Sequence, residues 1–293
     1  MRADGLIRLL ENKSIRFTQP EFLNDPYECH VTLDTNARQK LVSDFYAYLI
    51  EKEPSKEKCH LQERAEANEP SLVEMALKQF RTLRSELGVL SLTESPMNLL
   101  MWAHYGDEHR GAVVEIDIQH HSLFKPSKDD TEFSGFFAVN YSAEKIAGIP
   151  NRETVIDSLL TKSTDWQYEN EWRFIRTTNL LRHAKDQIYV ADIDPAVIKQ
   201  VIFGARFPDE LLESAATKLK SETFKHVEVN KAVMNPHKFG MRIVKASDFG
   251  WMQLHRSHHF GEFAKEAMLV IPMLEDENQY GVSLDHISGG HSG

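Results

Sequence analysis

The chain lacks the features that would place it outside the cell or in a membrane. Only two of its 293 residues are cysteines, Cys29 and Cys59, which is too few for a disulfide framework. Its apolar runs are far shorter than a bilayer requires, and its start carries charges among the apolar residues, unlike a signal peptide. We therefore expect a cytoplasmic protein that does not associate with membranes.

The chain also has fewer basic than acidic residues. The chain has 34 lysines and arginines against 44 aspartates and glutamates, a formal net charge of −10. This excess repels phosphate backbones, so broad nucleic-acid binding is not expected, although a local basic groove stays possible. With 41% hydrophobic residues the composition is that of an ordinary globular protein, and it names neither a partner nor a cofactor.

Several common catalytic motifs are missing. The sequence has no phosphate-binding loop ending in Gly-Lys-Ser/Thr, no glycine-rich dinucleotide turn, no Gly-x-Ser-x-Gly elbow and no His-Glu-x-x-His. These absences exclude the commonest nucleotide hydrolases, esterases and zinc proteases. A histidine cluster at 255–259 has no acidic or cysteine partner at a diagnostic spacing. We therefore predict no metal site.

What the sequence does contain is an alternation of short strands and helices, which predicts an α+β fold with a mixed, mostly antiparallel sheet and flanking helices. Residues 1–246 are expected to form a single domain, and 247–293 a C-terminal extension that is disordered at its end. The expected strands are 14–18, 88–93, 112–118, 136–141, 166–176, 188–193, 201–204, 227–229 and 241–244. The expected helices are 6–10, 95–105 and 211–219, and a further short helix is expected to start at Asp194-Pro195.

Residues 36–87 are predicted to be a helical insertion. Two apolar stripes at helical spacing occur there, and Pro54, Pro70 and a polar linker at 55–69 separate them. This pattern is typical of an inserted pair of helices.

Two helix starts are predicted from capping residues. Asp25, with Pro26 next and Glu28 three residues on, has the arrangement of a capping box. Ser95, followed by Pro96, is expected to cap the helix at 95–105. Asn24, in the loop before the first cap, is a candidate ligand-binding residue, but the cap alone also explains this segment.

The segment 166–176 has the clearest pattern in the chain. As a strand it would bury its aromatic residues and place Glu169, Glu171 and Arg173 on the other face. Two carboxylates about 7 Å apart at their Cα atoms could act as acid or base, hold a ribose hydroxyl, or stabilise an oxocarbenium-like centre. On the residues alone, a solvated strand face with a Glu–Arg pair is the more common situation.

Polar-tipped aromatic residues gather in the predicted helix at 95–105. His104 could act as a general base, and Trp102 or Tyr105 could stack on a planar ring. The alternative, favoured by the spacing alone, is a core helix with Trp102 buried and His104 hydrogen-bonded.

Several segments together resemble a bacterial family, the domain of unknown function 2971 family. The longest are Phe-Leu-Asn-Asp-Pro-Tyr-Glu at 22–28, Leu-Met-Trp-Ala-His-Tyr-Gly at 100–106 and Trp-Gln-Tyr-Glu-Asn-Glu-Trp-Arg at 166–173, and the specific feature is their combination in this order. The order of the segments agrees too, and the resemblance covers residues 5–245. Shorter matching segments lie at 14–17, 90–92, 109–111, 193–195 and 201–204.

The family pattern is in turn similar to ADP-ribosyltransferase-like folds, which implies an enzyme, or the relic of one, that uses NAD and acts as a toxin or phage-defence effector. By that similarity Glu171 or Glu169 would bind the nicotinamide ribose and steady the oxocarbenium ion. Trp102 or Tyr105 would pack on the nicotinamide ring, and His104, Asn24 and Arg173 would complete the binding site. This is an inference from fold similarity.

One departure from the family concerns the first strand. Many members begin with a strand carrying His-Tyr-Thr-Ser, and the printed sequence starts after that point. We expect the ribose-binding histidine to be missing and one sheet edge to be exposed, whether the start is misassigned or the member is truncated. Two other functions remain open: a non-catalytic protein that binds a ligand or partner, and a hydrolase of glycosidic or phosphoester bonds.

Overall fold

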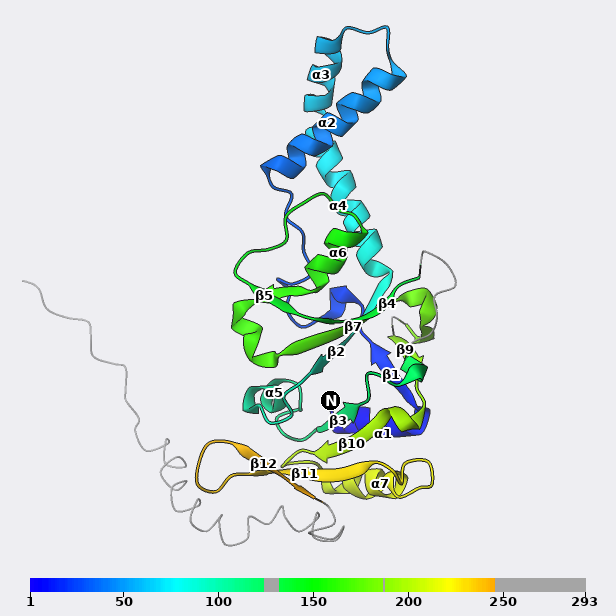
Figure 1. Ribbon diagram of the computed structural model, residues 1–293, viewed down its shortest axis with the longest axis vertical. Coiled ribbons are helices and arrows are strands. Elements are labelled where there is room, and N and C mark those ends of the chain that lie inside the picture. The colour runs from blue at the N-terminus through cyan, green and yellow to red at the C-terminus, as the bar shows by residue number, and fades with distance from the viewer. Residues whose placement is uncertain (124–131, 187, 246–293) are drawn as a thin grey trace, which may run out of the picture.

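A computed structural model of the chain describes residues 1–123, 132–186 and 188–245. It confirms the α+β class, with helices packed around several mostly antiparallel sheets (Figure 1). The α-helices are α1 (Ala3–Asn12), α2 (Thr35–Lys52), α3 (Lys58–Ala67), α4 (Glu69–Ser85), α5 (Leu99–His104), α6 (Arg152–Leu159) and α7 (Asp209–Leu219). Short 3-10 helices are η1 (Pro20–Phe22), η2 (His121–Leu123), η3 (Thr164–Glu169), η4 (Thr178–Leu180) and η5 (Pro195–Val197).

The strands form four sheets. Their bounds are β1 (Ser14–Phe17), β2 (Leu87–Thr93), β3 (Ala112–Ile116), β4 (Ser134–Ala138), β5 (Asn140–Ser142), β6 (Thr161–Ser163), β7 (Glu171–Thr177), β8 (Arg182–Lys185), β9 (Ile188–Asp192), β10 (Ile198–Phe203), β11 (Glu228–Met234) and β12 (Met241–Lys245). The strand orders are β1-β9-β8, β12-β11-β10-β3, β2-β7-β4 and β5-β6. Only β10·β11 and β5·β6 are parallel among the pairs of described strands.

The largest core cluster joins the first helix to the last. Leu6 of α1, Phe17 of β1, Phe174 of β7, Phe203 of β10 and Leu212 of α7 all belong to it, and all are almost completely buried. Burial of such side chains from the two ends of the described chain supplies the main drive for folding. It also fixes β7, which carries the candidate site, against the rest of the molecule.

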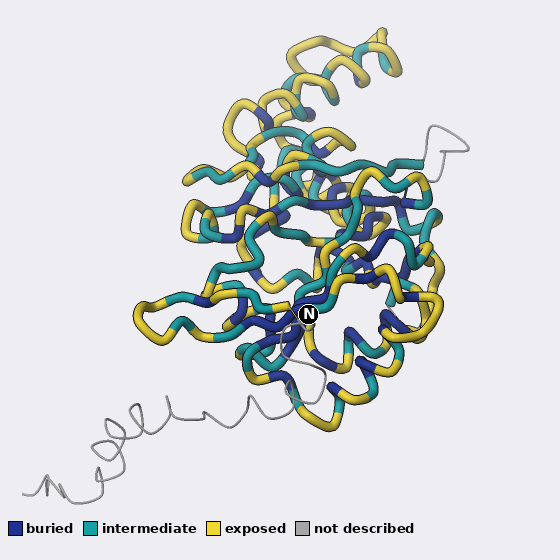
Figure 2. Tube along the Cα trace, turned by 60° about the horizontal axis from the view of Figure 1, so that its bottom comes forward, coloured by how far each residue is buried: buried dark blue, intermediate teal, exposed yellow. Residues whose placement is uncertain are grey.

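The insertion contains three helices rather than the predicted pair, so the prediction of a polar linker at 55–69 is wrong. Its residues are mostly good helix formers, and α3 occupies most of the stretch. Leu61 and Ala65, one turn apart, pack against Leu49 of α2 and form a small core of their own. The three helices project from the sheets, and many residues in them are exposed (Figures 1 and 2).

The predicted helix after Asp25 is absent. The Asp25 carboxylate accepts a hydrogen bond from the Tyr27 N–H at 2.8 Å, which closes an Asx turn instead of capping a helix. Cys29 then adopts a left-handed backbone with φ of 59°, which a right-handed helix cannot contain. Glu28, expected to close a capping box, instead turns toward Arg173.

The other predicted cap is also displaced. Helix α5 begins at Leu99, because the Asn98 side chain accepts hydrogen bonds from the Leu100 and Met101 N–H groups. Asparagine is as good a capping residue as serine. The Ser95 N–H is bound by the Thr93 hydroxyl.

The predicted strand at 166–176 is half right. Residues 164–169 form η3, Asn170 is left-handed with φ of 43°, and the strand β7 begins only at Glu171. The sequence pattern there has strand-like alternation, but asparagine tolerates the left-handed region and ends the 3-10 helix. Glu169 and Glu171 are therefore separated by a turn at Asn170 and do not lie on one continuous strand.

None of the helices within the described ranges combines the length and the apolar character needed to cross a bilayer. The predicted extension at 247–293 and the histidine cluster within it lie outside the described residues. The predicted domain boundary at residue 246 stays a prediction.

Candidate functional site

A cluster of charged side chains lies inside the protein at the start of β7. Glu28, Lys162, Glu169, Glu171 and Arg173 are each no more than 6% exposed. The predicted Glu-Glu-Arg group is therefore present, but it faces the interior instead of solvent. The turn after Asn24, the end of α6 and strand β6 supply its partners.

Arg173 is the centre of the cluster. Its guanidinium donates to both oxygens of Glu171, with Nε to Oε1 at 2.8 Å and Nη2 to Oε2 at 3.0 Å. It also donates to Glu28 Oε2 at 2.5 Å and to the Leu159 carbonyl at 2.5 Å. A planar guanidinium suits two carboxylates at once, so Arg173 ties the 24–29 turn and α6 to β7.

Lys162 is the second cation. Its ammonium donates to Glu169 Oε2 at 2.6 Å and to Glu171 Oε2 at 3.3 Å, and it lies 4.8 Å from the centre of the Trp166 ring. The two predicted carboxylates are thus bridged by a lysine that the sequence analysis did not identify. Lys162 sits in a three-residue strand, β6, which is too short to show a period.

Tyr105 links α5 to this cluster. Its hydroxyl donates to Glu169 Oε1 at 2.6 Å and accepts from the Asn24 amide at 2.8 Å. The Thr93 hydroxyl donates to the Glu169 carbonyl at 2.6 Å. The structure therefore brings together Asn24, Tyr105 and Glu169, which lie up to 145 residues apart in the sequence.

Charge balance sets the protonation of the cluster. Burial alone would raise the pKa of Glu171, but the charge and hydrogen bonds of Arg173, together with Lys162, hold it below its usual range. For Lys162, burial opposes the charge, yet Glu171 and Glu169 raise its pKa. Burial and the Glu169 carboxylate raise the pKa of Tyr105. Glu171 is therefore an ionised carboxylate and Tyr105 a neutral hydrogen-bond donor at neutral pH.

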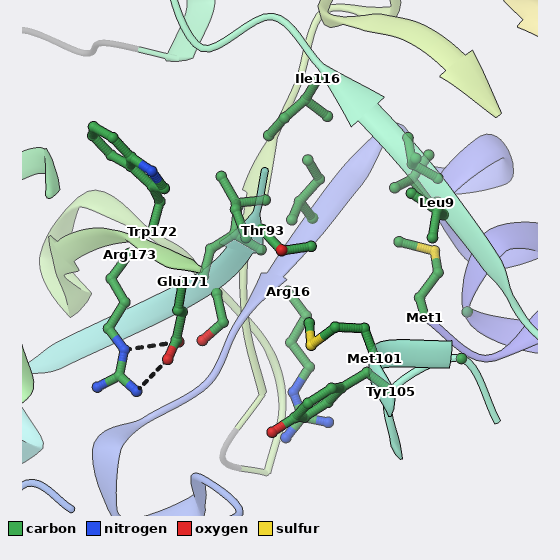
Figure 3. A pocket seen from close by; sticks show the side chains of 18 of the residues that line it. Met1, Leu9, Arg16, Thr93, Met101, Tyr105, Ile116, Glu171, Trp172 and Arg173 are labelled. Carbon is green, nitrogen blue, oxygen red and sulfur yellow. Dashed lines mark hydrogen bonds and ion pairs between the residues drawn. The ribbon is translucent and has the colours of Figure 1, made fainter. Parts of the chain in front are cut away.

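The cluster lines one end of a cavity of about 1450 Å³. Glu171 and Arg173 lie at the left of Figure 3, and Tyr105 with Met101 lies across from them. The side toward α1 and β3 is lined by apolar residues such as Leu9 and Ile116. A cavity that is mostly apolar with a few convergent polar groups is the usual form of a small-molecule site.

Two other predicted site residues lie apart from the ionic cluster. Trp102 is 2% exposed, packs with Ile202 and Met241, and donates its indole N–H to the Pro96 carbonyl at 2.7 Å. It borders the cavity from this core position. His104 is exposed, with its ring 6.4 Å from the rings of both Tyr105 and Tyr168.

Glu28 was predicted only as part of a helix cap, and its role in the cluster was missed. Its Oε2 pairs with Arg173, while Oε1 is buried without a hydrogen-bond partner among the described residues. The only sequence signal would have been an acidic residue among apolar neighbours after a turn, which is weak.

Within the described residues no group of histidine, cysteine or acidic side chains has the arrangement of a metal site. The cluster has its own cations, Lys162 and Arg173, in the places where a metal would otherwise offset the carboxylates. The cluster has three carboxylates and two cations, so a ligand would meet an excess of negative charge beside the apolar wall of the cavity.

Residues 101–174 match the model of a family described as a protein of unknown function, DUF2971. This stretch includes Tyr105, Lys162, Glu169, Glu171 and Arg173, so most of the cluster lies within the match. No curated protein and no solved structure matches the chain. The comparisons support the resemblance to this family, while the similarity to ADP-ribosyltransferase-like folds stays a prediction.

Proposed function

We propose that the protein is an ADP-ribosyltransferase-like enzyme that cleaves the bond between nicotinamide and ribose in NAD. The observation that supports this most directly is the pair of carboxylates, Glu169 and Glu171, held by Lys162 and Arg173 at the wall of a large cavity. A preorganised anion stabilises a developing positive charge.

The proposed chemistry needs little from the protein besides this charge. As the bond from the anomeric carbon to the nicotinamide nitrogen breaks, the ribose gains oxocarbenium character, and nicotinamide leaves with the bonding electrons. A nucleophile, water or an acceptor side chain, then adds to the same carbon. Glu171, ionised because Arg173 and Lys162 lower its pKa, would stabilise the cationic state and accept hydrogen bonds from the ribose.

Tyr105 is the better candidate for packing against the nicotinamide ring. It is half-buried, borders the cavity and is oriented by Glu169 and Asn24. Trp102 is held in the core by Pro96, so it would have to leave its place to stack. His104 is exposed beside Tyr105 and does not border the cavity formed by the described residues, so the proposal gives it no contact with the bound ring.

A second function is favoured by a different observation. All four side-chain oxygens of Glu169 and Glu171 already accept hydrogen bonds from protein groups, namely Tyr105, Lys162 and Arg173. A cluster so fully satisfied could serve a non-catalytic protein that binds a ligand or partner in the cavity, with the ionic groups holding the walls in place.

The two functions are separated by nicotinamide release from NAD, measured for the wild type and for Glu171→Gln and Glu169→Gln. Glu115→Gln is the matched control, because Glu115 also borders the cavity but is exposed and outside the cluster. An enzyme predicts release by the wild type and the control and its loss in Glu171→Gln. A binding protein predicts no release by any form and a lower urea midpoint for both cluster variants.

A toxin or phage-defence role would follow from the enzymatic function. Expression of the wild type in bacteria would then deplete NAD or modify a target and slow growth, while Glu171→Gln would be tolerated. Equal growth with both forms would argue against that role.

A further inference from the structure

Strand β3 has one unpaired edge. It pairs with β10 on one side only, and at its other side the Ala112 N–H and C=O are both bonded to Met1, at 2.9 and 2.8 Å. Because alternate residues of a strand direct their backbone groups to the same side, Val114 and Ile116 direct theirs to this same edge. Within the described residues no strand pairs with them there.

Strand β2 has a second unpaired edge. It pairs with β7, and on its far side Val89 is the one residue bonded to another described segment, through reciprocal hydrogen bonds of 2.8 Å with Thr18. By the same alternation, Ser91 and Thr93 direct their N–H and C=O groups outward beyond this bridge. No described strand continues the ladder that Thr18 begins.

Both edges border the same cavity, and its wall between them is apolar. Residues 90–93 of β2 and 113–116 of β3 line it. Apolar side chains cover this part of the cavity, and they are Leu9, Ile15, Leu90, Val114, Ile116 and Phe136. Ser91 is exposed and Thr93, Val114 and Ile116 are half-buried, so these edges are accessible to another chain, and a strand edge with free groups is a template for another strand.

We propose that this cavity receives an extended segment of another polypeptide chain as an added strand, which pairs with β3 on one side and β2 on the other. Such a strand would continue the ladders that Met1 and Thr18 start, and would join β12-β11-β10-β3 and β2-β7-β4 into one sheet. Backbone pairing would provide affinity, and apolar side chains on both faces of the segment would provide fit.

An arginine at the cavity wall, unpaired among the residues that the structure describes, indicates that the bound segment carries an acidic residue. Arg16 of β1 borders the cavity and is exposed, and it forms no ion pair within the described part of the chain (Figure 3). The other exposed arginines that border the cavity are Arg2, Arg8 and Arg182, and they are paired with Asp107, Asp4 and Asp192. The segment is therefore apolar over the length of these edges, about four residues, and carries a carboxylate only where it passes Arg16. Glu115 of β3 is exposed, borders the same cavity and forms no ion pair within the described residues, so a second carboxylate beside β3 is disfavoured.

The added strand does not depend on the proposed activity. Ser91 and Thr93 lie opposite Arg173 and Glu171 in the ladder with β7, so the added strand would run beside the charged cluster and form one wall of the small-ligand site. Its binding is measured without NAD, so a failure of peptide binding and a failure of nicotinamide release are separate results.

The test uses the full chain and two synthetic peptides, Val-Ile-Val-Ile-Val-Asp and the same peptide with Lys in place of Asp, each made soluble by a polyethylene glycol tail. Calorimetry gives affinity, and hydrogen exchange followed by NMR gives the position. We expect the acidic peptide to bind and to slow exchange at Val114, Ile116, Ser91 and Thr93 by at least tenfold. The lysine peptide and Arg16→Gln should each bind about tenfold more weakly.

Val114→Pro removes an N–H from the open edge, where proline is tolerated, and should weaken binding about tenfold, whereas Val114→Thr keeps the N–H and should bind like the wild type. If the proline variant does not fold, a peptide N-methylated at alternate residues gives the same test on the wild type. No binding, binding without protection of these amides, or amides already protected in the free chain by its own apolar run at 267–274 would each overturn the proposal.

Discussion

Replacing Arg173 with methionine is the sharpest test of the buried cluster. The guanidinium pairs with Glu28 and Glu171 and donates to the Leu159 carbonyl. Without it, Glu28 and Leu159 would lose these hydrogen bonds, and Glu171 would keep the one from Lys162. Removing one side of a buried ion pair leaves uncompensated charge and typically costs about 3–5 kcal/mol. Because a domain is stable by only about 5–15 kcal/mol, the loss would be large but measurable.

Urea unfolding at pH 7, followed by circular dichroism, measures this loss. Arg182→Met is the matched control, since the Arg182–Asp192 pair is exposed, at 52% and 57%, and such pairs contribute about 1 kcal/mol at most. A cost for Arg173→Met no greater than that of the control would refute the account of Arg173 as the centre of the cluster.

The pH dependence of the same comparison gives a second check. In the wild type the lowered pKa of Glu171 means that this group stabilises the fold above its unfolded pKa of about 4.3, and that the contribution is lost as pH falls. Without Arg173 the carboxylate has lost its main partner, so its protonation relieves the strain of buried charge. The difference in unfolding free energy between the wild type and Arg173→Met should therefore shrink below about pH 4.5. A difference that stays constant from pH 7 to 4 would show that charge is not its cause.

Three further predictions concern single groups. Tyr105→Phe removes the hydroxyl that joins Asn24 to Glu169 and should lower the unfolding free energy by about 1–2 kcal/mol, and an unchanged urea midpoint would contradict this. Cys59 is exposed, whereas Cys29 is buried and burial raises the pKa of its thiol to about 12. At pH 8 the native protein should therefore react with one equivalent of a disulfide reagent and the unfolded protein with two. Rapid reaction of both cysteines in the native protein would contradict the burial of Cys29. Any nicotinamide release should lack an inflection from Glu171 between pH 5 and 8, because the lowered pKa keeps this carboxylate ionised throughout. A steep loss of release by the wild type as pH falls from 8 to 5 would contradict the assigned charge state.

Much of the fold follows from local patterns in the sequence. Strands β2, β3, β9 and β10 and helix α7 lie where alternation or helical spacing predicts them. Strand β8 was missed, because its four residues are all exposed and show no period. The prediction of α3 as a linker failed because its helix depends on packing against α2, which no local pattern shows.

The candidate site was predictable in part for a physical reason. Glu169, Glu171 and Arg173 lie within five residues of one another, so their proximity is local, even though the strand predicted across Glu169 is interrupted at Asn170. The contribution of Lys162 depends on β6 lying beside the start of β7. The contribution of Glu28 depends on the turn at Asp25, which the sequence pattern wrongly indicates to be the start of a helix. Both require tertiary contacts.

Burial was the main error in the predicted site. The alternation around Glu171 suggested a charged face toward solvent, whereas Arg173 is 1% exposed. A charged group is buried only when its partners are buried with it, and those partners come from three other segments. The sequence could indicate the chemistry of the site but not its enclosure.

Whether Glu171 serves glycosidic chemistry on NAD is decided by nicotinamide release from NAD. The purified full chain is compared with Glu171→Gln and with the cavity-wall control Glu115→Gln. We expect the wild type and Glu115→Gln to release nicotinamide at the same rate, and Glu171→Gln to release none while it retains its native circular dichroism spectrum. Release by Glu171→Gln at the wild-type rate, or no release by any of the three folded proteins, would contradict this role of Glu171.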